Sequence, residues 1–169
     1  ETFVASAMIK AGFDIDFEDE GDSTTSHCEF TATFRETGKK FSVEAKMRGP
    51  NKSSVGVGKQ LIKALKKRAL HTRVVFIEVN VNDDADDVKT KAVLEDGLAS
   101  LRKWEARLQL DGNPAPTAYV VVSNNPHVFT QQATFRRWAL GEGFKIPEFK
   151  VDTRFTSLRE AVTTREKHV

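Results

Sequence analysis

Alternating apolar and polar residues predict three β-strands in the first third of the chain. Residues 13–17 alternate phenylalanine and isoleucine with acids, and the same two-residue period runs through residues 28–35 and 40–47. Between the latter two segments, residues 36–39 (Glu-Thr-Gly-Lys) have the composition of a tight turn. We therefore expect these two strands to form an antiparallel hairpin.

Helical spacing of apolar residues surrounds these strands. Residues 2–11 predict a helix that ends before Gly12, and residues 55–70 predict a second helix with lysines on its polar face. The later elements are a buried strand at 74–81, a long helix from the acidic residues 83–87 to about Leu110, and a buried strand at 118–122. Residues 74–122 thus predict a right-handed βαβ unit.

The order of these elements predicts an α/β fold. The order α-β-β-β-α-β, followed by α-β, implies a mixed central β-sheet flanked by helices. At 169 residues the chain is long enough for one domain, 1–169. We expect a core over 1–123 and a C-terminal extension over 124–169. Its pattern is weaker: a segment around 129–140, a strand near Phe149 and a helix from about Ser157.

Composition excludes several classes of protein. No apolar stretch approaches the roughly 20 residues that a transmembrane helix needs, so no membrane association is expected. The N-terminus lacks the order of a secretory signal and an initiator Met, which indicates a processed or excised chain. Cys28 is the only cysteine, so an internal disulfide framework is excluded and a reduced, cytoplasmic setting is expected.

Acidic and basic residues are segregated although the net charge is only +2. Residues 46–73 contain nine lysines and arginines and no acid. A basic stretch that coincides with a helix predicts a surface that faces phosphates, although a solvated helix face explains it equally well. The candidate nucleic-acid contacts are Arg48, Lys52, Lys59, Lys63 and Lys67.

The predicted hairpin brings three ionisable side chains to one face. With Thr37-Gly38 at the turn, Thr31 lies opposite Glu44 and Glu29 lies opposite Lys46. One face of the hairpin is then apolar, and the other carries two carboxylates and a lysine among Thr and Ser residues.

This combination suits metal-dependent chemistry on phosphate esters. Two adjacent carboxylates repel each other, and Mg²⁺ prefers one or two protein carboxylates together with water and phosphate oxygens. A lysine beside them can position or deprotonate the attacking water, or stabilise the transition state. The alternative is an ordinary cross-strand ion pair between Glu29 and Lys46, worth about 0.2–1 kcal/mol.

The strand Ser42-Val43-Glu44-Ala45-Lys46, with an acid fifteen residues before Glu44, resembles the PD-(D/E)XK nuclease superfamily. The resemblance covers about half of the chain and implies a restriction-endonuclease-like core. It implies that Glu44 and the Ala45 carbonyl bind metal, that Lys46 is the catalytic lysine, and that Glu29 is the first acid. The family's Pro-Asp pair is Cys28-Glu29 here.

The same resemblance suggests three further site residues. Gln60, early in the second helix, corresponds to a polar residue that several such nucleases place near the scissile phosphate. Glu1 lies where some members carry a metal-binding acid, and Asp22 competes with Glu29 as the first acid.

The expected function is therefore a Mg²⁺-dependent (or Mn²⁺-dependent) deoxyribonuclease that hydrolyses phosphodiester bonds in DNA. A homodimer is one option, because many enzymes that cut both strands act as dimers. The alternative is a catalytically inactive module of the same fold that binds nucleic acid or protein.

Overall fold

The computed structural model describes residues 1–18, 26–47, 56–81, 87–124 and 138–146. The elements follow one another in this order: α1 (Thr2–Lys10), β1 (Phe13–Phe17), β2 (Phe30–Phe34), β3 (Lys40–Met47), α2 (Val57–Leu65), β4 (Thr72–Glu78), α3 (Asp87–Glu105), β5 (Gln109–Leu110), β6 (Asn113–Pro114), β7 (Ala118–Asn124) and β8 (Trp138–Phe144).

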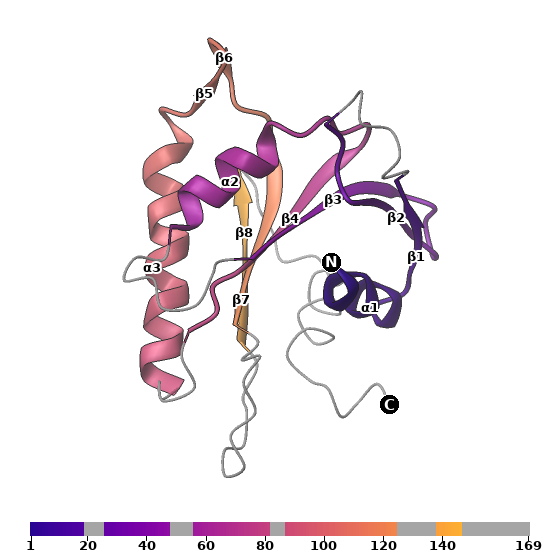
Figure 1. Cartoon of the computed structure of the whole chain (residues 1–169), viewed down its shortest axis with the longest axis horizontal. Helices are drawn as coiled ribbons and strands as arrows, with labels where there is room; N and C mark the ends of the chain where they lie inside the picture. Colours follow the sequence, from indigo (N-terminus) through magenta and orange to yellow (C-terminus); the bar gives the residue numbers. More distant parts are fainter. Residues whose placement is uncertain (19–25, 48–55, 82–86, 125–137, 147–169) are drawn as a thin grey trace.

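The main sheet has six strands in the order β1-β2-β3-β4-β7-β8. β3, β4 and β7 run parallel to one another. The pairings of β1 with β2, of β2 with β3 and of β7 with β8 are antiparallel. Figure 1 shows α2 and α3 on one side of this sheet and α1 on the other. The expectation of an α/β chain with a mixed central sheet flanked by helices is confirmed.

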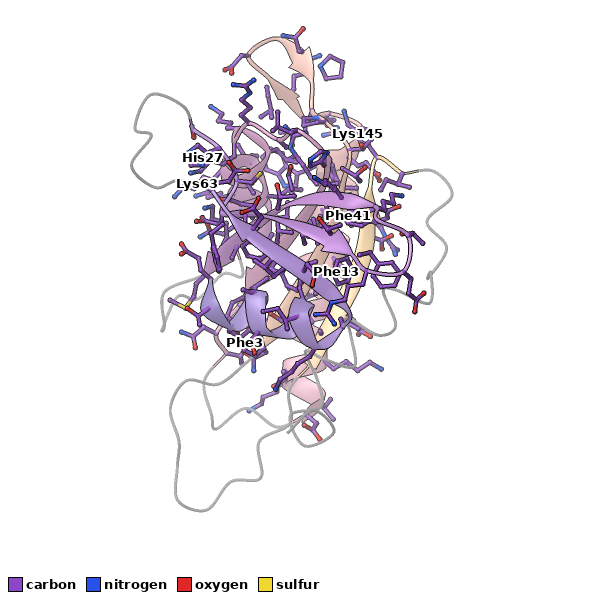
Figure 2. All side chains as sticks on the ribbon, turned by 90° about the vertical axis from the view of Figure 1, so that its right-hand side faces the viewer. Phe3, Phe13, His27, Phe41, Lys63 and Lys145 are labelled. Carbon is purple, nitrogen blue, oxygen red and sulfur yellow. The ribbon has the colours of Figure 1, made fainter. Side chains whose placement is uncertain are left out.

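Each face of the sheet has its own hydrophobic core. Under α1, phenylalanines of the first strands pack together, and the ring centroids of Phe13 and Phe41 lie 6.0 Å apart. Figure 2 labels both residues on the first strands and Phe3 on α1. On the other face, the apolar stripes of α2 and α3 cover β4 and β7. Because the central strands are buried on both faces, β4 and β7 are almost continuously apolar.

The second helix is shorter than its apolar pattern predicts. α2 ends at Leu65, not at Leu70, because the next residues pair with the segment that leads into β2. The Arg68 amide donates to the Ser26 carbonyl over 2.6 Å, and the Cys28 amide donates to the Arg68 carbonyl over 3.2 Å. Lys67 and Arg68 therefore belong to this connection and not to the helix.

The third helix and the chain after it also differ from the prediction. α3 ends at Glu105, before the predicted Leu110, because residues 109–114 form a hairpin. Its turn residues Asp111 and Gly112 both have positive φ, as a two-residue hairpin turn requires. The predicted start of the helix at 83–86 lies outside the described residues.

The strand β8 was missed by the sequence pattern. It contains Gly141 and Gly143, which weaken a strand signal, but it pairs with β7 along its whole length. Residues 138–144 of the predicted C-terminal extension therefore belong to the central sheet. The predicted strand near Phe149 and the helix from Ser157 lie outside the described residues. No helix in the described ranges is long and apolar enough to cross a membrane.

Candidate active site

The β2–β3 hairpin has a different register from the predicted one. Thr31 lies opposite Ser42 and not opposite Glu44, a shift of two residues. A two-residue turn at Thr37-Gly38 would require positive φ at the β-branched Thr37. Instead, only Gly38 in this turn has positive φ, and the Phe34 amide closes a longer loop by donating to the Lys39 carbonyl.

Because the shift is even, every side chain keeps its predicted face. The described pairing ends at Phe30 and Val43, so Glu29 does not lie opposite Lys46 as predicted. The Glu29 amide donates over 3.0 Å to the carbonyl of Val43, the residue that Phe30 already faces.

Lys46 joins the two carboxylates. Its Nζ lies 3.6 Å from Glu29 Oε1 and in direct contact with Glu44 Oε1. The Glu44 side chain is 1% exposed, whereas those of Lys46 and Glu29 are each 20% exposed. The three predicted residues therefore converge at a partly open site with one deeply buried acid.

Glu44 is buried because β3 lies inside the sheet. It pairs with Val75 of β4, on the face that α2 covers. Apart from the Lys46 ammonium, no described residue donates a hydrogen bond to either carboxylate oxygen, and Oε2 of Glu44 is buried without a partner. A buried carboxylate oxygen without a hydrogen bond lowers the stability of the folded protein. A cation or a hydrogen-bond donor bound at this atom would remove that cost.

The carboxylates determine the charge of Lys46. Burial would lower the pKa of its ammonium, but the hydrogen bond and charge of Glu44, together with the charge of Glu29, outweigh burial and raise this pKa. Lys46 is therefore a permanent cation at neutral pH.

A third acid was missed by the sequence analysis. Glu18 follows β1, its amide donates to the Glu29 carbonyl over 3.3 Å, and its Oε1 accepts a 3.4 Å hydrogen bond from Thr31. It therefore lies on the same polar face as Glu29. The signal was present in the acids that alternate along residues 14–18, which indicated only a half-buried strand.

Arg73 is a second cation on this face, and the sequence pattern does not distinguish it from the other basic residues of 46–73. It pairs with Ser42, two residues before Glu44, and its guanidinium donates to the Lys67 carbonyl over 3.2 Å. Its Nε is buried and has no hydrogen-bond partner within the described ranges.

The neighbouring Cys28 is a free, buried thiol. Burial, followed by the negative charge of Glu44, raises its pKa to about 11. A buried thiol with a raised pKa forms little thiolate, which is the reactive species.

The remaining candidate residues are distributed around this centre. Gln60 is half-buried in the first turn of α2, and Glu1 lines a cavity together with Ala45 and Lys46. Lys59 and Lys63 are exposed on α2, whereas Lys67 is half-buried after its end. Asp22, Arg48 and Lys52 lie outside the described residues.

The protein ligands for a metal are few. In the part of the chain that the structure describes, no three His, Cys, Asp or Glu side chains are grouped closely enough to hold a metal ion. A divalent cation here would take one or two carboxylates and complete its shell with water and phosphate oxygens, which is the pattern that Mg²⁺ prefers. The unpartnered Oε2 of Glu44 fits such a cation.

Comparisons with protein-family models, with curated proteins and with solved structures find no significant match to this chain.

Proposed function

We propose that this chain is a metal-dependent nuclease domain that hydrolyses phosphodiester bonds in DNA. The observation that supports this most is the contact of one lysine, Lys46, with the carboxylates of both Glu29 and Glu44. The alternation of strands β2 and β3 produces this convergence, and the local pattern Glu44-Ala45-Lys46 resembles the motif of the PD-(D/E)XK nucleases.

Glu29 and Glu44 would hold Mg²⁺ or Mn²⁺, with the Ala45 carbonyl as a further ligand. Such an ion lowers the pKa of a bound water and stabilises negative charge on a phosphoryl oxygen. Because carboxylates raise the pKa of Lys46, its side chain remains protonated. We assign Lys46 the role of orienting the water and stabilising the charged transition state.

The helix α2 would bind the DNA backbone. Lys59 and Lys63 are exposed on it, and the helix covers the same face of the sheet from which Glu44 projects. Contacts of this kind with phosphates provide affinity but little choice of base sequence. Gln60, in the same turn as Lys59, is the polar residue proposed to lie near the scissile phosphate.

A second function is favoured by the same ion pair. Lys46 already balances the negative charge of the buried Glu44 without a metal ion. With this function the domain is a catalytically inactive module that binds nucleic acid or protein, and it binds DNA without cleaving it.

Cleavage of supercoiled plasmid in the presence of Mg²⁺ or Mn²⁺ distinguishes the two functions. We expect nicking by the wild-type protein and a loss of at least about a hundredfold in Glu44→Gln and in Lys46→Met. The matched control is Glu95→Gln, because Glu95 is an exposed acid on α3 that pairs only locally with Lys91 at 3.6 Å. Equal nicking by all four proteins, or none by a folded wild type, rejects the nuclease.

A further inference from the structure

Trp104, in the last turn of α3, is a large aromatic side chain at the surface between two helices. Helices α2 and α3 pack against each other on the same face of the sheet (Figure 1). Trp104 reaches the first turn of α2, where a Cβ added to Gly58 would lie 3.0 Å from the indole Nε1. This distance is shorter than an ordinary van der Waals contact, so the glycine leaves the room that the indole occupies.

The indole of Trp104 is held on one side and exposed on another. The three atoms nearest to the Gly58 Cβ position, Nε1, Cδ1 and Cε2, all belong to its five-membered ring, which therefore faces α2. The apolar stripe of α3 before it is buried, because Leu94 and Leu101 are 0% and 1% exposed. Trp104 continues this stripe by one turn and is nevertheless 43% exposed. It thus offers solvent a flat apolar surface whose position is fixed.

Positive charge lies beside this surface on α2. Lys59, Lys63 and Lys66 are all exposed, and their spacing of four and three residues places them on one face of the helix. Lys59 directly follows the glycine that Trp104 contacts, and α2 contains no acid. Glu105, the acid next to Trp104 in the chain, accepts a hydrogen bond from the Lys145 amide. The exposed aromatic ring is therefore adjacent to a row of ammonium groups.

We propose that Trp104 stacks on an unpaired base of DNA whose phosphates lie along the lysines of α2. Proteins that bind single strands combine a positively charged track for the backbone with aromatic side chains on which bases stack. Lys59, Lys63 and Lys66 provide the track, and Trp104 provides the stacking surface. The bases of an intact duplex are stacked inside the double helix, so they are not available to the indole.

This inference rests on the proposed function, because it is the nuclease proposal that identifies the ligand of α2 as DNA. It adds a class of substrate to that proposal: DNA that contains unpaired nucleotides. Since α2 covers the face of the sheet from which Glu44 projects, a strand that follows α2 lies on the same face as the candidate active site. The phosphate contacts of α2 alone would not distinguish paired from unpaired DNA.

The fluorescence of Trp104 tests the stacking directly. Metal-free buffer prevents cleavage, so only binding is observed. Oligothymidylate should quench the fluorescence of the wild-type protein, and this quenching should be lost in Trp104→Phe. The second tryptophan of the chain, Trp138 on β8, remains in that variant and serves as the internal reference. A duplex of the same length should bind with little quenching.

Affinities of the variants measure the contribution of the ring. Trp104→Ala should bind the single strand about tenfold more weakly, or worse, and should bind the duplex as the wild type does. Trp104→Phe should retain most of the affinity because phenylalanine also stacks. The matched control is Val88→Ala, since Val88 is an exposed apolar residue, 77% exposed, in the first turn of the same helix. This variant should bind both forms of DNA normally.

The outcomes separate the stacking site from the nuclease. Quenching and the loss in Trp104→Ala, without any nicking of DNA by the wild type, reject the nuclease and retain the stacking site. Quenching that persists in Trp104→Phe, single-strand affinity unchanged in Trp104→Ala, or an equal loss of affinity for duplex rejects the stacking site. Each of these results leaves the nuclease standing, because cleavage is measured separately.

Discussion

The ammonium of Lys46 contacts the carboxylate of Glu44, the largest charged side chain that is fully buried in the described part of the chain. The Glu44 side chain is 1% exposed, whereas those of Lys46 and Glu29 are each 20% exposed. The negative charge of the buried Glu44 is therefore balanced by Lys46, which is itself partly exposed to solvent.

Replacing Lys46 by Met should destabilise the protein by about 1–3 kcal/mol, because the buried Glu44 then has no cationic partner. Met retains most of the length of the side chain, so packing changes little. Urea unfolding measures the effect. The double variant Glu44→Gln/Lys46→Met should recover part of the loss, and equal stability of single and double variants would contradict the pairing.

The stabilising effect of Lys46 should persist through neutral pH. Its folded-state pKa is raised, so the contribution is fully present below the unfolded pKa of about 10.4 and is lost as pH rises through the folded value. The difference in unfolding free energy between wild type and Lys46→Met should therefore be constant from about pH 6 to pH 9 and shrink only above about pH 10.4. A midpoint near neutrality would show that Lys46 is not held protonated by Glu44.

Cys28 should react with thiol reagents only after unfolding. Its thiol is buried and its pKa is raised to about 11, so the reactive thiolate is scarce at pH 8. Because the chain has a single cysteine, colour release from a disulfide reagent reports on this site alone. We expect a slow reaction in buffer and a rapid one in urea, and rapid labelling of the native protein would disprove the burial.

Lys59 and Lys63 should contribute to DNA affinity through phosphate contacts. The variant Lys59→Glu/Lys63→Glu should bind DNA more weakly, and the slope of log affinity against log salt should fall by about 2. The matched control is Lys91→Glu/Lys103→Glu, which changes two exposed lysines on α3. Titration of labelled duplex at several salt concentrations measures both. An equal loss in both variants would indicate a general charge effect.

The sequence predicted the elements and the faces of the hairpin better than its register. Alternation alone places Glu29, Glu44 and Lys46 on one side, since a period of two is insensitive to an even shift. The register depends on backbone angles at Thr37 and Gly38, which composition does not determine. The sequence therefore predicted that Lys46 and both acids share one face, although the predicted pairing of the two strands was wrong by two residues.

Tertiary pairing explains the other differences. Arg68 continues a helical pattern in sequence, yet its backbone pairs with residues 26–28, which no local rule reveals. Strand β8 forms its backbone hydrogen bonds with β7, and its two glycines weaken the sequence pattern that would predict a strand. Glu18 joins the candidate site because β1 lies beside β2, a neighbour relationship that the pattern of one strand cannot show.

The most direct test of the central claim is a titration of Mn²⁺ monitored by electron paramagnetic resonance, which counts free and bound ions. If Glu29 and Glu44 share a divalent cation, the wild-type protein and Glu95→Gln bind one ion that Glu29→Gln and Glu44→Gln both lose. If the two site variants bind Mn²⁺ as the wild type does, these carboxylates are not a metal site.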